Sequence, residues 1–118
     1  MFGFGKISKE VRFRRKMAKM LHGKHLKYVM ERLTDEDDII VGREGALIVR
    51  GEEFIVFASQ KDVFRSIIDD TDFSELMSLG GVIISGLDIL SGKDRSVIAH
   101  YTDNAEDYFV FAVDKLGF

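Results

Sequence analysis

The sequence predicts an α+β protein in which a basic N-terminal helix precedes an antiparallel sheet of about five or six strands, with one or two short helices. Two patterns support this prediction. Residues 6–33 are rich in Lys, Arg, Met, Leu and Ala, which are good helix formers. From residue 39 onward, β-branched and aromatic runs are bounded by glycine-bearing turns. With 118 residues, we expect a single domain over 1–118, with a basic helical arm at 6–33 and an acidic β-rich body at 39–113.

The predicted helix has a clear beginning and an ambiguous middle. Ser8 is a preferred N-cap residue, and Glu10 places a negative charge in the first turn. At about 100° per residue, the apolar side chains divide into two sets on nearly opposite sides. The first set is Phe13, Met17, Met20 and Leu21, and the second is Leu26, Val29, Met30 and Leu33. The helix therefore either breaks or bends near Gly23, or continues with each half packing on a different neighbour. We favour a break or a bend, because most amphipathic patterns cover one core.

The body begins with residues predicted to form hairpins. Apolar runs at 39–41 and 46–49 flank a glycine-bearing turn at 42–45, and a further run follows at 54–57. A second hairpin is expected from residues 82–89 and 96–101, with a loop at 91–94. Residues 108–113 form the last strand-like run.

Residues 60–79 fit two interpretations. Val63, Phe64, Ile67 and Ile68 follow helical spacing, but a short apolar run can equally form a strand. We favour one or two short helices here. The core is expected to include Leu26, Val29, Met30, Leu33, Leu47, Val49, Ile55, Phe57, Val82, Ile84, Val97, Ala99, Phe109 and Phe111.

Two stretches of the body resemble known proteins. The run ELMSLGGVIISG at 75–86, together with RSVIAHY at 95–101, resembles small bacterial proteins of unassigned function. The run GALIV at 45–49, leading into EFIVF at 53–57, is similar to an early hairpin of pleckstrin-homology-like modules. Such modules usually close with a C-terminal helix, whereas residues 108–118 are short and β-rich. The resemblance implies no catalytic residue.

Composition excludes several classes of site. The chain has no Cys, so a disulfide framework, a thiol nucleophile and a Cys-based metal site are excluded. No apolar run approaches the roughly 20 residues of a membrane span, and the first residues lack the apolar region of a signal peptide. We therefore expect a cytoplasmic protein without a cofactor.

The sequence gives little support for a catalytic or metal site. His22 and His25 would share a helix face, but neighbouring lysines would repel a cation and no third ligand is in reach. The acid clusters at 35–38 and 69–72 lack calcium-loop spacing, and we interpret them as solvated turns. Phosphate-binding glycine loops are absent. We expect a non-enzymatic protein; a small enzyme with a site near His100 and Tyr101 is the alternative.

Charge is distributed unevenly along the chain. Residues 6–32 contain ten Lys or Arg and two acids, a net charge of +8. Residues 33–118 contain seven Lys or Arg and eighteen acids, a net charge of −11. We predict an interaction module whose partner is another protein or a second copy of the chain, and in which the basic helix docks on the acidic body or on a second protomer. An anionic membrane surface is the alternative partner, and nucleic acid is disfavoured by the acidic body. The predicted surface comprises Arg12, Phe13, Arg14, Arg15, Lys16, Met17, Lys19 and Met20.

Overall fold

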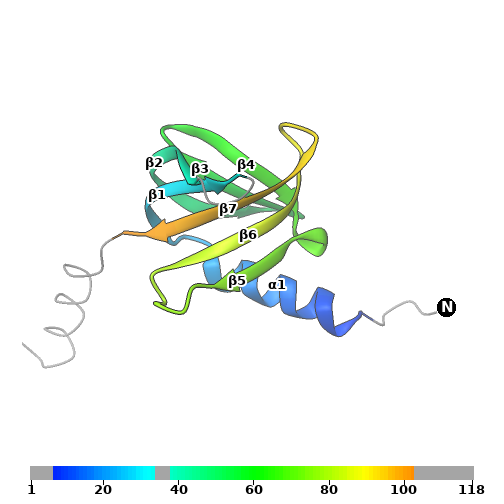
Figure 1. Ribbon diagram of the computed structural model, residues 1–118. Helices are drawn as coiled ribbons and strands as arrows, with labels where there is room; N and C mark the ends of the chain where they lie inside the picture. Colours follow the sequence, from blue (N-terminus) through cyan, green and yellow to red (C-terminus); the bar gives the residue numbers. More distant parts are fainter. Residues whose placement is uncertain (1–6, 34–37, 103–118) are drawn as a thin grey trace, which may run out of the picture.

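A computed structural model describes residues 7–33 and 38–102 of the chain. One helix, α1 (Lys9–Leu21), precedes a single seven-stranded antiparallel sheet with the strand order β4-β3-β2-β1-β7-β6-β5 (Figure 1). The α+β class is confirmed, with seven strands rather than five or six. The elements that follow α1 are β1 (His25–Arg32), β2 (Asp38–Arg50), β3 (Glu53–Ala58), β4 (Lys61–Ile67), the 3-10 helix η1 (Ile68–Asp70), β5 (Asp72–Glu75), β6 (Gly81–Asp88) and β7 (Lys93–Tyr101).

The connection between β4 and β5 forces the sheet to curl. These strands are the two edges of the sheet, yet only residues 68–71 separate them in sequence. A flat sheet of seven strands would hold its edges about 29 Å apart, whereas five residue steps span at most about 18 Å. The sheet therefore bends back on itself (Figure 1), and the amide of Ile89, just after β6, donates to the carbonyl of Arg65 in β4 over 2.7 Å.

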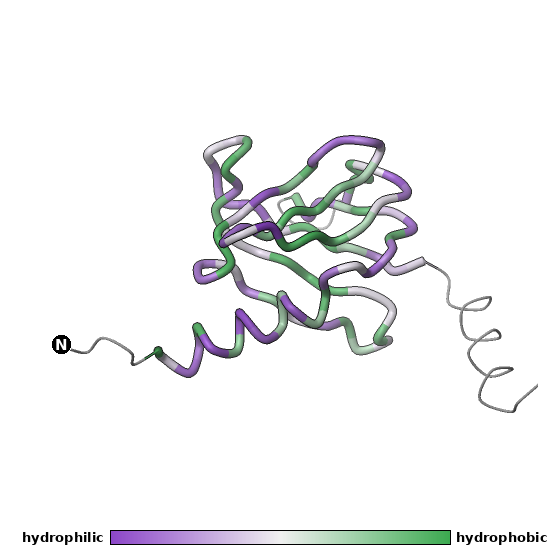
Figure 2. The backbone as a smooth tube through the Cα atoms, turned by 180° about the vertical axis from the view of Figure 1, so that it is seen from behind, coloured by the Kyte–Doolittle hydropathy of each residue, from purple (hydrophilic) through white to green (hydrophobic). Residues whose placement is uncertain are grey.

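The inside of the curled sheet forms the core, and α1 lies against it. Phe54, Phe64 and Ile84 are fully buried there, and the rings of Phe54 and Phe73 meet edge to face at 4.8 Å. Helix α1 adds Met17, Ala18 and Leu21 to the same cluster. Figure 2 shows α1 beneath the sheet, with hydrophilic and hydrophobic residues alternating along its turns. One face of α1 is therefore part of the core.

Helix α1 begins as the sequence predicts but ends earlier. The amide of Val11 donates to the Ser8 hydroxyl over 3.1 Å, which confirms the N-cap. The helix stops at Leu21, and Gly23 follows with φ +92°, a conformation that favours glycine. The break near Gly23 is therefore confirmed, whereas a helix extending to residue 33 is wrong, because residues 25–32 form β1.

A β-bulge explains why β1 has helical spacing. Leu26 and Val29 are both buried although they are three residues apart, and strict alternation would place them on opposite faces. The pairing of β1 with β7 shifts register between Leu26 and Tyr28. The extra residue returns Val29 to the inner face, so the apolar pattern resembles that of a helix.

A β-bulge also explains why the prediction of short helices over residues 60–79 is wrong. Val63 and Phe64 are both buried in β4, where the pairing with β3 shifts register. This bulge produced the apparent helical spacing, and the helical part is the single 3-10 turn η1. The region forms β4, η1 and β5 rather than α-helices.

The glycines at 42 and 45 do not form the predicted turn, because β2 runs unbroken from Asp38 to Arg50. A Cβ on Gly45 would lie 1.6 Å from the Phe57 carbonyl oxygen, and one on Gly42 would lie 2.6 Å from the Ala58 Cβ. These glycines allow β3 to approach β2 closely. The second predicted hairpin is confirmed as β6 and β7.

Most of the predicted core is buried. Met30 and Phe57 are only half-buried, Val49 packs on the core from its edge, and Leu33 is 42% exposed. Phe109, Phe111 and the strand predicted at 108–113 lie outside the described residues. The buried members are Leu26, Val29, Leu47, Ile55, Val82, Ile84, Val97 and Ala99.

Candidate functional site

Two neighbouring arginines hold α1 against its own sheet. Arg15 makes a bidentate pair with Asp69, at 2.8 Å from Nε to Oδ1 and 2.7 Å from Nη2 to Oδ2. Arg14 donates to Asp72 Oδ1 over 2.9 Å and to the Asp69 carbonyl oxygen over 2.9 Å. The hydrogen bond from Arg15 holds the pKa of the Asp69 carboxyl below its usual value. The acid cluster at 69–72 is therefore a binding site for the helix rather than only a solvated turn.

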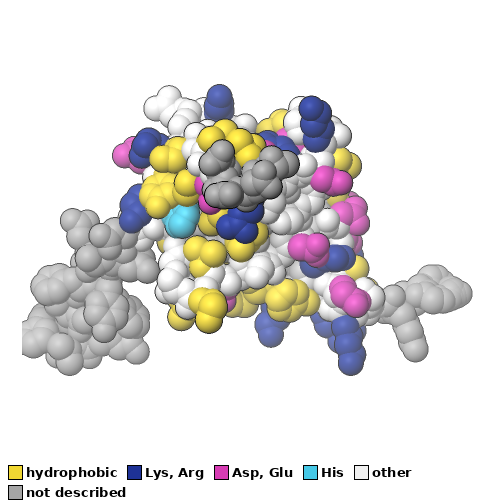
Figure 3. Space-filling model, viewed as in Figure 1, with side chains coloured by type: hydrophobic (Ala, Val, Ile, Leu, Met, Phe, Trp, Pro, Cys, Tyr) yellow, Lys and Arg dark blue, Asp and Glu magenta, His cyan; other side chains and the backbone are white. Residues whose placement is uncertain are grey.

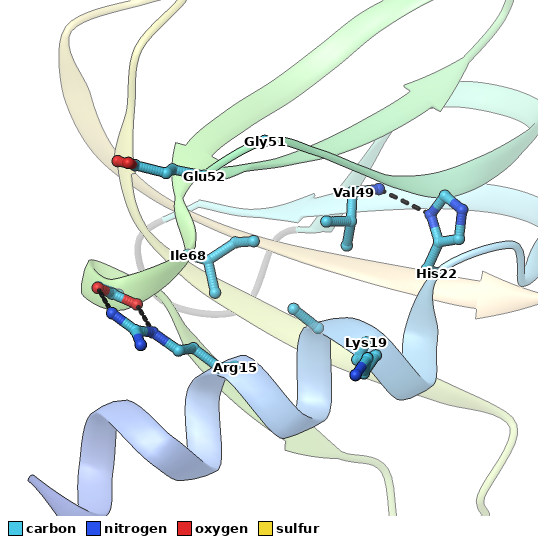
Figure 4. Close-up of a pocket in the computed structure, with 9 residues that line it drawn as sticks. Arg15, Lys19, His22, Val49, Gly51, Glu52 and Ile68 are labelled. Atoms are coloured by element: carbon cyan, nitrogen blue, oxygen red, sulfur yellow. Dashed lines mark hydrogen bonds and ion pairs between the residues drawn. The ribbon is translucent and has the colours of Figure 1, made fainter. Parts of the chain in front are cut away.

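A second contact holds the C-terminal end of the helix. The amide of Val49 in β2 donates to His22 Nδ1 over 2.8 Å, which requires an unprotonated Nδ1. Between this contact and the Arg15–Asp69 pair lies an open cavity of about 530 Å³, lined by Ala18, Val49 and Ile68 among others (Figure 4). Helix α1 is thus fixed at both ends of this cavity.

The opposite side of α1 faces solvent and carries both cations and apolar side chains. At about 100° per residue, its members all lie within an arc of about 120° around the helix axis, so they share one side of α1. Phe13 is 53% exposed and Met20 is 60% exposed. Figure 3 shows Lys and Arg side chains beside hydrophobic ones along the lower edge of the molecule, where α1 runs. We call this side the outer face of α1; it comprises Lys9, Arg12, Phe13, Lys16, Lys19 and Met20. Lys19 lies at its border, where it also lines the cavity.

The cations of the outer face make no ion pair within residues 7–33 and 38–102. Every ion pair of α1 in that part of the chain involves Arg14 or Arg15. Docking of the helix on its own body therefore uses two of its basic residues and leaves Lys9, Arg12 and two further lysines available. These four side chains concentrate positive charge on one side of the helix, which attracts anions.

The structure divides the eight residues of the predicted interaction surface into three groups. Arg14 and Arg15 are bound to the body, and Met17 is buried in the core with 8% exposure. Lys9 was missed, although its spacing from Arg12 and Phe13 could have identified it. The members that lie on the outer face are Arg12, Phe13, Lys16, Lys19 and Met20.

A second ionic cluster lies inside the curled sheet. Arg95 in β7 binds Glu31 in β1 through two hydrogen bonds of 2.9 and 2.7 Å, and binds Asp88 in β6 over 2.8 Å. Asp88 is fully buried, and it also accepts the amides of Arg65, Leu90 and Ser91. Burial opposes its ionisation, yet these donors, led by Arg95, hold its pKa below the ordinary value. The cluster joins strands where the sheet closes, so we assign it a structural role.

The surroundings of His100 and Tyr101 do not resemble a catalytic site. The His100 ring lies 4.6 Å from the Tyr28 ring, and burial followed by the charge of Lys27 lowers its pKa. Burial raises the pKa of Tyr101 to about 12, and its hydroxyl has no hydrogen-bond partner within the described residues. Ser85 lies on the neighbouring strand β6 and is a serine that could act as a nucleophile, but its hydroxyl meets that of Ser96 at 2.9 Å rather than the His100 ring. A nucleophile beside a base is the arrangement that an active serine needs, and it is not formed by these residues.

Three further observations concern metals, membranes and known proteins. In the part of the chain that the structure describes, no three His, Asp or Glu residues gather where they could hold a metal ion. None of the helices formed by those residues has the length and apolarity to cross a membrane. No family model, curated protein or solved structure matches the chain. The resemblance to pleckstrin-homology-like modules therefore stays a prediction from the sequence.

Proposed function

We propose that this chain is a non-enzymatic interaction module that binds an acidic protein partner through the outer face of α1. One observation carries the proposal: Arg14 and Arg15 fix the helix on its own sheet, and the cations on its other side have no partner among residues 7–33 and 38–102. A helix that is already folded and anchored loses little further conformational entropy on binding. The proposal places the protein in the cytoplasm.

The outer face combines the two properties that such a partner needs. Its four cations would attract an acidic surface and set the orientation of the encounter. Phe13 and Met20 would supply apolar area at the centre of the contact, since aromatic residues and Met are enriched in interface cores. An acidic surface carrying exposed aromatic or aliphatic side chains is therefore the matching partner.

An anionic membrane surface is the second candidate. The observation in its favour is that Phe13 and Met20 lie on either side of Lys16 on the exposed side of the helix. Helices that bind in the headgroup region combine apolar side chains with Lys and Arg in this way. The two candidates differ in whether lipid is required.

Binding of the full chain to two anionic probes tests the proposal and separates these candidates. The probes are poly-glutamate, followed by fluorescence anisotropy, and vesicles of phosphatidylserine and phosphatidylcholine, followed by sedimentation. We expect binding to poly-glutamate that weakens from low to physiological salt. The double variant Arg12→Glu/Lys16→Glu should weaken it at least about tenfold, or about 1.4 kcal/mol.

The matched control is Lys61→Glu/Lys93→Glu. Both lysines are exposed and lie in the sheet, away from α1. The control replaces two cations by two acids, so it changes the net charge by the same amount as the test variant. We expect its affinity to fall far less. Equal losses of affinity in the two variants would mean that binding depends only on net charge, and would contradict the proposal. Binding to vesicles without binding to poly-glutamate would favour the membrane candidate.

A further inference from the structure

About half of the acids of residues 38–102 are used in ion pairs within the described structure. Residues 38–102 contain eleven acids, and six of them make ion pairs with arginines: Asp38, Glu53, Asp62, Asp69, Asp72 and Asp88. The same residues of this chain, or of a second copy, therefore offer the outer face of α1 five acids that make no ion pair within the described residues. Further acidic charge lies in the sequence beyond residue 102.

Residues 103–118 carry acidic charge in a suitable pattern. They contain four acids and one lysine, a net charge of −3. An uninterrupted apolar run at 108–113 lies between Asp107 and Asp114. The sequence thus combines an apolar centre with flanking acids, which complements an outer face that combines Phe13 and Met20 with flanking cations.

The described structure places the beginning of this segment close to α1. The amide of Thr102 donates to the carbonyl of His25 over 2.9 Å, and His25 is only four residues beyond Leu21, the last residue of the helix. Helix α1 has 13 residues and is about 20 Å long. Sixteen further residues cover that length even at helical rise, about 24 Å.

We propose that residues 103–118 of the same chain occupy the outer face of α1 and compete there with the acidic partner. This inference rests on the proposed function, because it takes the same face as the binding surface. Attachment through Thr102 gives the segment an effective concentration of about the millimolar range on its own helix. A contact too weak to form between separate molecules can therefore form within one chain, and an external partner would have to displace it.

The absence of Cys from the chain allows a direct test by paired spin labels. Labels at Glu10→Cys and Gly117→Cys report the distance between α1 and the segment in the full chain. Within the described residues the ion pairs of α1 are those of Arg14 and Arg15, so Glu10 makes none there. We expect a short, narrow distance distribution that broadens in high salt. It should be lost in Arg12→Glu/Lys16→Glu and kept in Lys61→Glu/Lys93→Glu.

Reversing the complementary charges provides the rescue. Adding Glu106→Lys/Asp107→Lys to Arg12→Glu/Lys16→Glu should restore the narrow distribution, as expected of groups that interact. A broad distribution unaffected by all these variants would overturn the inference. A short distance that disappears when labelled chains are diluted with unlabelled chains would also overturn it, because the occupant would then be a second copy.

A separate readout distinguishes failure of the inference from failure of the proposed function. The neutral variant Glu106→Gln/Asp107→Asn should raise the affinity of the full chain for poly-glutamate several-fold, whereas the control Glu44→Gln/Asp94→Asn should not. If neither variant changes an affinity that still depends on Arg12 and Lys16, the inference is wrong and the proposed function stands. If Arg12 and Lys16 have no effect on poly-glutamate binding, the proposed function is wrong.

Discussion

Adjacent residues of α1 have different roles because each step along the helix turns by about 100°. Arg14 and Arg15 point to the sheet and bind Asp72 and Asp69, whereas Arg12 lies on the exposed side. From the sequence composition alone, these arginines form one basic cluster. The identity of their acceptors required the fold, because residues 69–72 are more than 50 positions away in sequence.

At the residue scale, we predict that Asp88→Asn destabilises the protein by about 2–3 kcal/mol at neutral pH. The variant weakens charge-assisted hydrogen bonds from Arg95 and from backbone amides inside the fold. Because the folded pKa of Asp88 is depressed, its stabilisation is present above the unfolded value of about 3.9 and is lost as pH falls through the folded pKa. Urea unfolding across this acid range should show a weaker pH dependence in the variant. An equal pH dependence of the free energy of unfolding in the two proteins would show that ionised Asp88 does not stabilise the fold.

A second residue-scale prediction concerns the close approach of β2 and β3. Gly45→Ala should destabilise the protein by about 3 kcal/mol or more, because its Cβ would overlap the Phe57 carbonyl oxygen. Gly80→Ala is the control, since its Cβ would come no closer than 3.4 Å to the Ser78 hydroxyl. Thermal unfolding measures both, and a similar small effect in the two variants would show that the strands can separate at little cost.

At the scale of elements, sequence patterns predicted the regular parts and failed at irregular ones. The start of α1, the break near Gly23 and the β6–β7 hairpin were predictable from capping, propensity and turn composition. Strand β1 and the 60–79 region were not, because bulges place buried residues at helical spacing. The candidate site was predictable where helical spacing decides it, as for Phe13 and Met20. The burial of Met17 followed from tertiary packing.

The element-scale prediction concerns the cap of α1. Ser8→Ala removes the hydroxyl that accepts the Val11 amide and should destabilise the helix by about 1 kcal/mol. Hydrogen exchange of the first-turn amides should quicken, while exchange in the core strands should change less. Ser8→Asp retains an acceptor and should preserve slow exchange. Unchanged exchange in Ser8→Ala would mean that α1 is held by Arg14, Arg15 and its buried face alone.

At the scale of the whole molecule, the charge asymmetry of the sequence is partly resolved within the fold. Two arginines of α1 and two acids of residues 69–72 neutralise one another across the contact between helix and sheet. The remaining cations of α1 are gathered on its outer face. The proposed function and the proposed docking of residues 103–118 both follow from this remaining charge.

The central claim is that the outer face of α1 is the binding surface. The most direct test follows the backbone amide chemical shifts of the full chain during titration with poly-glutamate. We predict that the largest shifts fall on Lys9, Arg12, Phe13, Lys16, Lys19 and Met20, and that Lys61 and Lys93 shift little. Saturable shifts centred on the sheet, with α1 unaffected, would contradict the claim.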